Sequence, residues 1–112
     1  MKIIVASDGD DENSNVSEHF GRCKYYIIWD NGKITSIENP YVAHSPGQMP
    51  EFIKSLGADI IISGGMGERA VENFKKLGIK VFTGARGKVI DAIKNYSELG
   101  NEPCEKSKND LK

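Results

Sequence analysis

The sequence predicts an α/β domain built on a five-stranded mixed sheet, and three observations support this fold class. A short apolar run opens the chain at residues 2–7, and two further strand-like runs flank an Asn-Gly turn at 31–32. Beyond residue 48, stretches with apolar residues at helical spacing alternate with short apolar runs. Two joints, at 56–60 and 77–81, share a leucine-glycine pattern that leads into a strand. Such joints are typical of right-handed parallel crossovers, so the expected element order is β-β-β-α-β-α-β-α.

The first half of the chain is expected to supply the antiparallel part of the sheet. Residues 2–7 are apolar and rich in β-branched side chains, which is typical of a buried strand. Residues 8–18 are polar and acidic and predict a loop. Strands are predicted at 24–29 and 33–38, and the Asn-Gly pair between them favours a tight hairpin turn.

The second half is expected to supply the parallel part. A helix is predicted from Met49 to a glycine cap at Gly57, and a wholly apolar strand follows at 59–63. The remaining predicted elements are a helix with an apolar stripe at Ala70, Val71, Phe74 and Leu77 that ends at Gly78, a strand at 80–83 and a helix at 88–96. These elements make one domain over residues 1–97, and residues 98–112 are expected to form a polar, flexible tail.

Composition excludes several classes of function. The 112 residues carry 15 basic and 16 acidic side chains, so the basic excess of a general nucleic-acid binder is absent. No segment approaches the roughly 20 apolar residues of a membrane span, and the first apolar run is too short for a signal peptide. We therefore expect a cytoplasmic protein with no nucleic-acid or membrane partner. In that compartment Cys23 and Cys104 are expected to be thiols rather than a disulfide.

The stretch Glu18-His19-Phe20-Gly21-Arg22-Cys23 is the first candidate site. It holds one of two histidines and one of two cysteines, both metal-ligating types, beside an arginine that can hold an anion. The alternatives are a surface role for His19 and a packing role for Cys23. A closed zinc site needs about four ligands, and no Cys-x2-Cys pair is present. The stretch therefore favours an exposed or externally ligated metal.

The stretch Gly64-Gly65-Met66-Gly67-Glu68-Arg69 is the second candidate site. Glycines let a backbone approach a ligand, and the free amides at a helix start attract anions. The pattern is neither a dinucleotide fingerprint nor a phosphate-binding Walker loop, and a plain tight turn is the alternative. Met66 is either a soft ligand or a packing residue, while Arg69 and Arg86 are candidates for oxyanion binding. If the first and fourth strands are parallel, both stretches lie beyond the same sheet edge, where ligands collect.

Three other kinds of site do not fit the sequence. A calcium loop starting at Asp8 would need glycine and glutamate where the chain has Asn13 and His19. A two-metal nuclease needs converging carboxylates, and the strand ending at Ser63 supplies none beside Asp8. A serine–histidine–acid triad has only His19 and His44 to draw on. A hydrolase or nuclease is therefore the least favoured class.

Several motifs occur together in one order along residues 1–97. They are Ala6-Ser7-Asp8-Gly9, Val16-Ser17-Glu18-His19-Phe20-Gly21-Arg22, Glu38-Asn39-Pro40, Gly64-Gly65-Met66-Gly67-Glu68-Arg69-Ala70 and Leu77-Gly78-Ile79-Lys80-Val81. In this combination the chain resembles the dinitrogenase iron–molybdenum cofactor biosynthesis family, which includes NifX- and NafY-like carriers and the C-terminal domain of NifB. The resemblance implies a ribonuclease H-like, three-layer α/β/α fold.

The resemblance also implies a function and a set of site residues. It implies that the chain binds an iron–sulfur or iron–molybdenum type cluster, or a precursor, with His19 as the leading metal ligand and Cys23 as the second. The expected cofactor-binding residues are Arg22, Gly64, Gly65, Met66, Gly67 and Arg69, with Met66 as a weaker ligand. On physical grounds, rather than from the resemblance, we expect Arg22 and Arg69 to neutralise the negative charge of the cluster. The expected function is a non-enzymatic carrier that exchanges the cluster with donor and acceptor proteins. The alternative is a metal-free regulatory module that binds small anions or nucleotides at 64–69.

Overall fold

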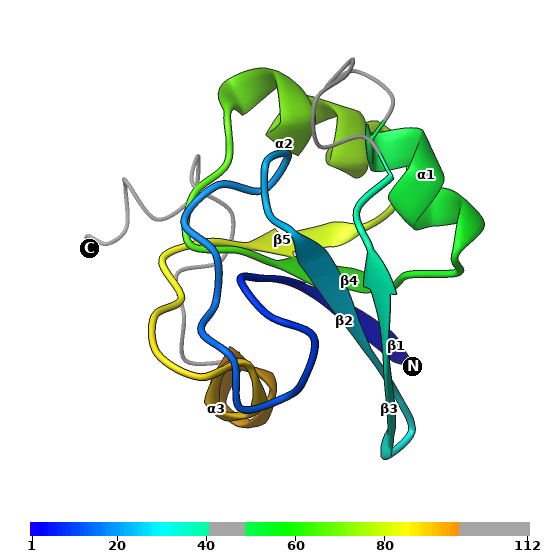
Figure 1. The fold of residues 1–112 in the computed structure, drawn as a ribbon. Helices are drawn as coiled ribbons and strands as arrows, with labels where there is room; N and C mark the ends of the chain where they lie inside the picture. The colour runs from blue at the N-terminus through cyan, green and yellow to red at the C-terminus, as the bar shows by residue number, and fades with distance from the viewer. Residues whose placement is uncertain (41–48, 97–112) are drawn as a thin grey trace.

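The computed structural model describes residues 1–40 and 49–96, in which five strands form one sheet with three helices beside it (Figure 1). In chain order the elements are β1 (Lys2–Ser7), β2 (Tyr25–Asp30), β3 (Lys33–Glu38), α1 (Met49–Ser55), β4 (Ile60–Ile62), α2 (Glu68–Lys76), β5 (Lys80–Phe82) and α3 (Val89–Asn95). The predicted element order is confirmed. The predicted tail at 98–112, which includes Cys104, lies outside the described residues, and so does His44.

The sheet has the strand order β3-β2-β1-β4-β5 and joins an antiparallel half to a parallel half. β1 pairs antiparallel with β2 and parallel with β4, so it is the central strand. The predicted hairpin turn is present between β2 and β3, where Asn31 and Gly32 have φ angles of 51° and 96°. Positive φ at both positions matches the twist of the flanking strands. Relative to the predicted ranges, β2 begins and ends one residue later, β4 is one residue shorter at each end, and β5 ends one residue earlier.

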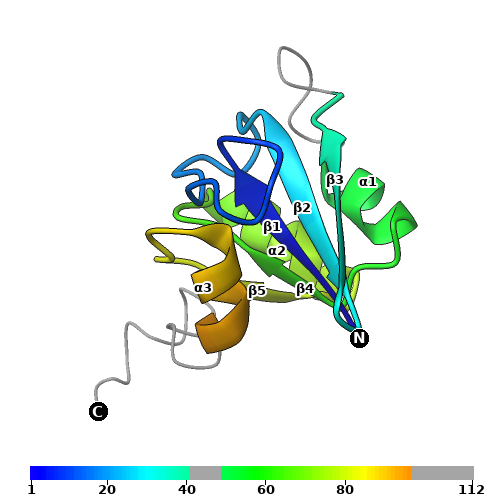
Figure 2. The same cartoon turned by 60° about the horizontal axis from the view of Figure 1, so that its bottom comes forward.

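Helices cover both faces of the sheet, with α1 and α2 on one face and α3 on the other (Figure 2). Side chains alternate along β1, so Ile4 and Ala6 pack toward α1 and α2, while Ile3 and Val5 pack toward α3. This two-sided burial explains why β1 and β4 are apolar without alternation. The three-layer α/β fold that the resemblance implied is confirmed. No helix in the described ranges combines the length and apolar character needed to cross a membrane.

After β1 the chain turns back at Ser17 and crosses the ends of β1 and β4, and this crossing shapes that edge of the sheet. After β1, the Ser17 amide donates to the Ala6 carbonyl at 2.9 Å, and the Gly64 amide donates to the Ser17 carbonyl at 2.9 Å. A Cβ on Gly64 would lie 2.9 Å from both the Glu18 Cα and the Ser17 carbonyl oxygen. A Cβ on Gly65 would lie 2.8 Å from the Glu18 carbonyl oxygen. Glycine is therefore required at both positions by the chain's own backbone.

Replacing Gly64 by alanine should destabilise the fold, because the new Cβ would press on the backbone at Ser17 and Glu18. Overpacking of this kind typically costs about 1–3 kcal/mol. The free energy of unfolding is measured in urea and followed by the fluorescence of Trp29, the single tryptophan of the chain. Gly21→Ala is the matched control, because nothing lies within 4 Å of a Cβ at that position. Equal unfolding free energies for the two variants would contradict this close packing.

Candidate functional site

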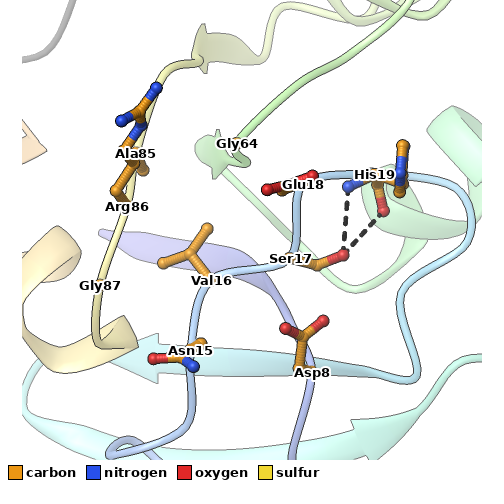
Figure 3. Close-up of a pocket in the computed structure, with 10 residues that line it drawn as sticks. All are labelled: Asp8, Asn15, Val16, Ser17, Glu18, His19, Gly64, Ala85, Arg86 and Gly87. Carbon is orange, nitrogen blue, oxygen red and sulfur yellow. Dashed lines mark hydrogen bonds between the residues drawn. The ribbon is translucent and has the colours of Figure 1, made fainter.

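An open pocket of about 910 Å³ lies at the edge where β1, β4 and β5 end (Figure 3). This volume falls within the range of roughly 300–1,000 Å³ that is typical of small-molecule and cofactor sites. Each of the three loops that follow these strands contributes to the wall. The lining residues are Asp8, Asn15, Val16, Ser17, Glu18, His19, Gly64, Ala85, Arg86 and Gly87. β1 and β4 are parallel, which confirms that the first loop and the Gly64 loop share one edge.

His19 lies on a loop whose backbone is held on both sides. The Ser17 hydroxyl accepts from the His19 amide at 3.1 Å and donates to the His19 carbonyl at 3.2 Å (Figure 3). The next residue, Phe20, is buried, and its ring centroid lies 5.2 Å from that of Phe74 and 5.8 Å from that of Tyr26. His19 is exposed and is one of the residues that line the pocket. An exposed ring on a fixed backbone is accessible to a metal that carries other ligands of its own.

Arg86 lines the same pocket from the loop that follows β5. The Gly84 amide donates to the Gly64 carbonyl at 3.1 Å, and the Val16 amide donates to the Gly87 carbonyl at 2.8 Å, so both ends of this loop are fixed. The Arg86 side chain itself is exposed. From the sequence, Arg86 is a candidate for oxyanion binding, but it is not one of the expected cofactor-binding residues. The available signal was its position in a glycine-flanked loop after a parallel strand, at the edge where ligands collect.

The charged side chains of the pocket carry both signs. Asp8 and Glu18 bring carboxylates, and Arg86 brings a guanidinium group. Figure 3 shows Glu18 between Arg86 and His19 in that view, with the Asp8 carboxylate pointing toward the Ser17 segment. In residues 1–40 and 49–96, no group of three or more His, Cys, Asp or Glu side chains is arranged to hold a metal ion. The described residues therefore offer few ligands rather than a closed metal cage.

Cys23 lies apart from the pocket, in the core on the α1 and α2 face. Its side chain is 2% exposed, and its thiol donates to the Phe20 carbonyl at 3.3 Å. The Tyr26 hydroxyl donates to the same carbonyl at 2.8 Å. Burial raises the pKa of the Cys23 thiol to about 11, and burial also raises the pKa of Tyr26. The thiol therefore keeps its proton at neutral pH, and its surroundings favour a packing role.

Most of the other predicted binding residues lie outside the pocket wall. Arg22 and Arg69 are exposed, and neither lines the pocket. Met66 is partly buried and packs against the core beside α1 and α2. Gly67 precedes α2 as its N-cap, and nothing lies within 4 Å of a Cβ at that position. Of the predicted residues, the structure brings only His19 and Gly64 together at the pocket.

Comparison with known proteins places the chain in a family. Residues 1–99 match the family described as dinitrogenase iron-molybdenum cofactor. An uncharacterized protein of Methanocaldococcus jannaschii, MJ0580, is 33% identical over 106 residues, which cover 88% of this chain and 86% of that protein.

Three solved structures share the fold. The crystal structure of PH0822 superposes with a TM-score of 0.77 at 39% identity, over 86% of this chain and 89% of that one. The NMR structure of the Thermotoga protein TM1290, a candidate NifB protein of the DUF35 family, superposes with a TM-score of 0.74 at 30% identity, over 90% of both chains. The apo form of the orange protein of Desulfovibrio gigas superposes with a TM-score of 0.79 at 21% identity, over 87% of both chains, which is a likeness of fold alone. With its family match over residues 1–99, the chain belongs to the dinitrogenase iron-molybdenum cofactor family.

Proposed function

We propose that this protein is a non-enzymatic, cytoplasmic carrier of an iron–sulfur or iron–molybdenum type cluster, or of a precursor of one, in metallocofactor assembly. The observation that carries the proposal is the exposed imidazole of His19 in an open pocket, on a backbone fixed at Ser17 and Phe20. Family membership supports the link to cofactor assembly. The relative TM1290 is itself described as a candidate NifB protein, which agrees with that link.

The small number of available ligands suits a carrier. Among the described residues, no trio of metal-ligating side chains converges on one point. A resident structural metal is enclosed by a full set of protein ligands, whereas a cluster that must leave again is better held by few bonds. His19 is the proposed protein ligand, and the other terminal positions of the metal ions would be filled by small ligands that the cluster brings with it. Donor and acceptor proteins can then exchange the cluster at the open side of the pocket.

Arg86 is the proposed anchor for the negative charge of the cargo. Two carboxylates, Asp8 and Glu18, line the same pocket and repel an anion, so binding depends on the guanidinium group beside them. The guanidinium also supplies N–H donors that suit sulfide or oxide ligands. Arg22 and Arg69 are exposed outside the pocket wall and are proposed to act from a longer distance.

The metal-free alternative, in which 64–69 binds anions or nucleotides, has less support from the geometry. It relied on glycines that let a ligand approach the backbone. The space beside Gly64 and Gly65 is instead filled by the backbone of residues 17 and 18. The exposed start of α2 at Gly67 is what remains of that argument.

Replacing His19 by alanine should remove most of the bound cluster. The protein is reconstituted anaerobically with iron and sulfide, with and without molybdate, and absorption and bound metal per chain are measured after desalting. Loss of a ligand should weaken binding by roughly 10-fold or more. His44→Ala, which changes the other histidine of the chain, is the matched control. If neither wild type nor variants retain metal, the carrier proposal fails, and a thermal-shift screen with nucleotides and oxyanions tests the alternative.

Replacing Arg86 by glutamine should also weaken retention of the cluster and reduce its dependence on salt. The proposed contact between the Arg86 guanidinium and the cluster is ionic and lies at an exposed site. There, 0.1 M salt screens charges that lie more than about 10 Å apart. Bound iron is measured after desalting at low and high ionic strength. Arg69→Gln and Arg22→Gln are the matched controls, because both remove an exposed arginine outside the pocket wall. A larger loss in either control would place the cargo away from the pocket.

Cys23 should react slowly with a thiol reagent in the folded protein. Because only the thiolate is nucleophilic and burial raises the pKa to about 11, the alkylation rate should keep rising up to that pH. At pH 8, iodoacetamide should modify Cys23 roughly 10-fold or more slowly in the folded than in the unfolded chain. A Cys104→Ser background leaves Cys23 as the single thiol. Rapid alkylation that bound cluster blocks would instead support Cys23 as a ligand.

A further inference from the structure

Buried polar side chains gather at the edge of the sheet that carries the pocket. Within residues 1–40 and 49–96 the buried polar residues are Ser7, Ser17, Asn39 and Ser63. Each serine hydroxyl donates to the carbonyl two residues further along the loop: Ser7 to Gly9 at 2.7 Å, Ser17 to His19 at 3.2 Å and Ser63 to Gly65 at 2.8 Å. Asn39 differs from the serines, because its partners lie far from it in sequence.

Asn39 follows β3 directly and joins the end of that strand to the segment that precedes β2. Its side-chain amide donates to the Gly21 carbonyl at 3.2 Å and to the Cys23 carbonyl at 2.8 Å. Its backbone amide donates to the Lys24 carbonyl at 2.9 Å. β2 begins only at Tyr25, so residues 21–23 have no strand partner, and Asn39 supplies hydrogen bonds in place of the sheet.

The segment that Asn39 holds begins at His19. The Arg22 amide donates to the His19 carbonyl at 3.3 Å and closes a turn over residues 19–22. Asn39 binds the third carbonyl of this turn, at Gly21, and the carbonyl just after it, at Cys23. Ser17 fixes the backbone of His19 from the other side. The orientation of the His19 backbone therefore depends on the hydrogen bonds of Ser17 on one side and on those of Asn39 on the other.

We propose that Asn39 is a positioning residue, which holds the turn at 19–22 so that the His19 imidazole faces the pocket and binds the cluster. This inference rests on the proposed function, in which His19 is the ligand. Asparagine suits the position because its NH2 group offers two donors, one for the Gly21 carbonyl and one for the Cys23 carbonyl. A carboxylate of the same shape would place acceptors against those carbonyls and leave them unpaired.

The first test measures the turn without any metal. Amide NMR spectra of the metal-free protein should show shifted or broadened signals at residues 19–24 in Asn39→Asp, with α3 unaffected. Ile93→Ala is the control for lost stability, because it empties a core site against the opposite face of the sheet. That variant should leave the signals of 19–24 in place. Unchanged signals for 19–24 in Asn39→Asp would overturn the proposal, whatever the cargo does.

The second test measures the cargo with iron and sulfide as the probe. Asn39→Asp should weaken cluster binding roughly 10- to 100-fold, as for residues that orient a metal ligand, while Ile93→Ala binds as wild type does. If Asn39→Asp does not fold, Tyr26→Phe removes the hydroxyl that binds the Phe20 carbonyl of the same loop and should give a smaller loss. A disturbed turn with wild-type binding would overturn the proposal. Absence of binding in wild type would count against the carrier function, while the metal-free spectra still decide the role of Asn39 in the turn.

Discussion

The contact between two stretches of backbone, at residues 17–18 and 64–65, organises the edge of the sheet on which the pocket depends. These stretches lie so close that no Cβ fits between them, and a hydrogen bond from the Gly64 amide to the Ser17 carbonyl joins them at 2.9 Å. The contact brings the loop after β1 across the end of β4. As a result, His19 from one loop and Arg86 from the next line a single pocket. Hydrogen bonds from the Ser17 amide to the Ala6 carbonyl and from the Val16 amide to the Gly87 carbonyl hold the same loop to β1 and to the loop after β5.

At the sheet edge that carries the pocket, buried polar side chains hold the loops, whereas exposed side chains are available to a ligand. Backbone carbonyls that the sheet does not reach are satisfied by buried Ser7, Ser17, Ser63 and Asn39, each 4% exposed or less. A buried carbonyl without a hydrogen bond costs free energy of folding, so these four small side chains stabilise the positions of the loops. The proposed binding groups, the side chains of His19 and Arg86, are exposed. A rigid base with exposed reactive groups is what pre-organised binding of a small cargo requires.

The sequence allowed the elements to be predicted, because apolar periodicity and the glycine joints reflect local geometry and two-sided burial. The meaning of individual site residues was harder to predict, because it depends on contacts between distant segments. Gly64 and Gly65 were interpreted as room for a ligand, whereas the backbone of residues 17 and 18 fills that room. Cys23 follows His19 by four residues, yet one side chain is 2% exposed and the other lines the pocket. No spacing rule for a loop distinguishes those two environments.

The packing of the core bears on the proposed release of a cargo, because a chain that folds without its cargo can lose it and stay folded. Large side chains such as Tyr26 and Phe74 are fully buried on the face beside α1 and α2, and a second cluster around Phe82 packs on the α3 face. Both clusters are formed by side chains of the chain itself, so we expect the fold to form without the binding free energy of a metal, unlike domains whose folding is coupled to zinc. If the proposed cargo binds at His19, it adds stability only in proportion to its own affinity. The proposed carrier function requires this separation, because an acceptor protein would then remove the cluster against its binding free energy alone and not against that of the whole fold.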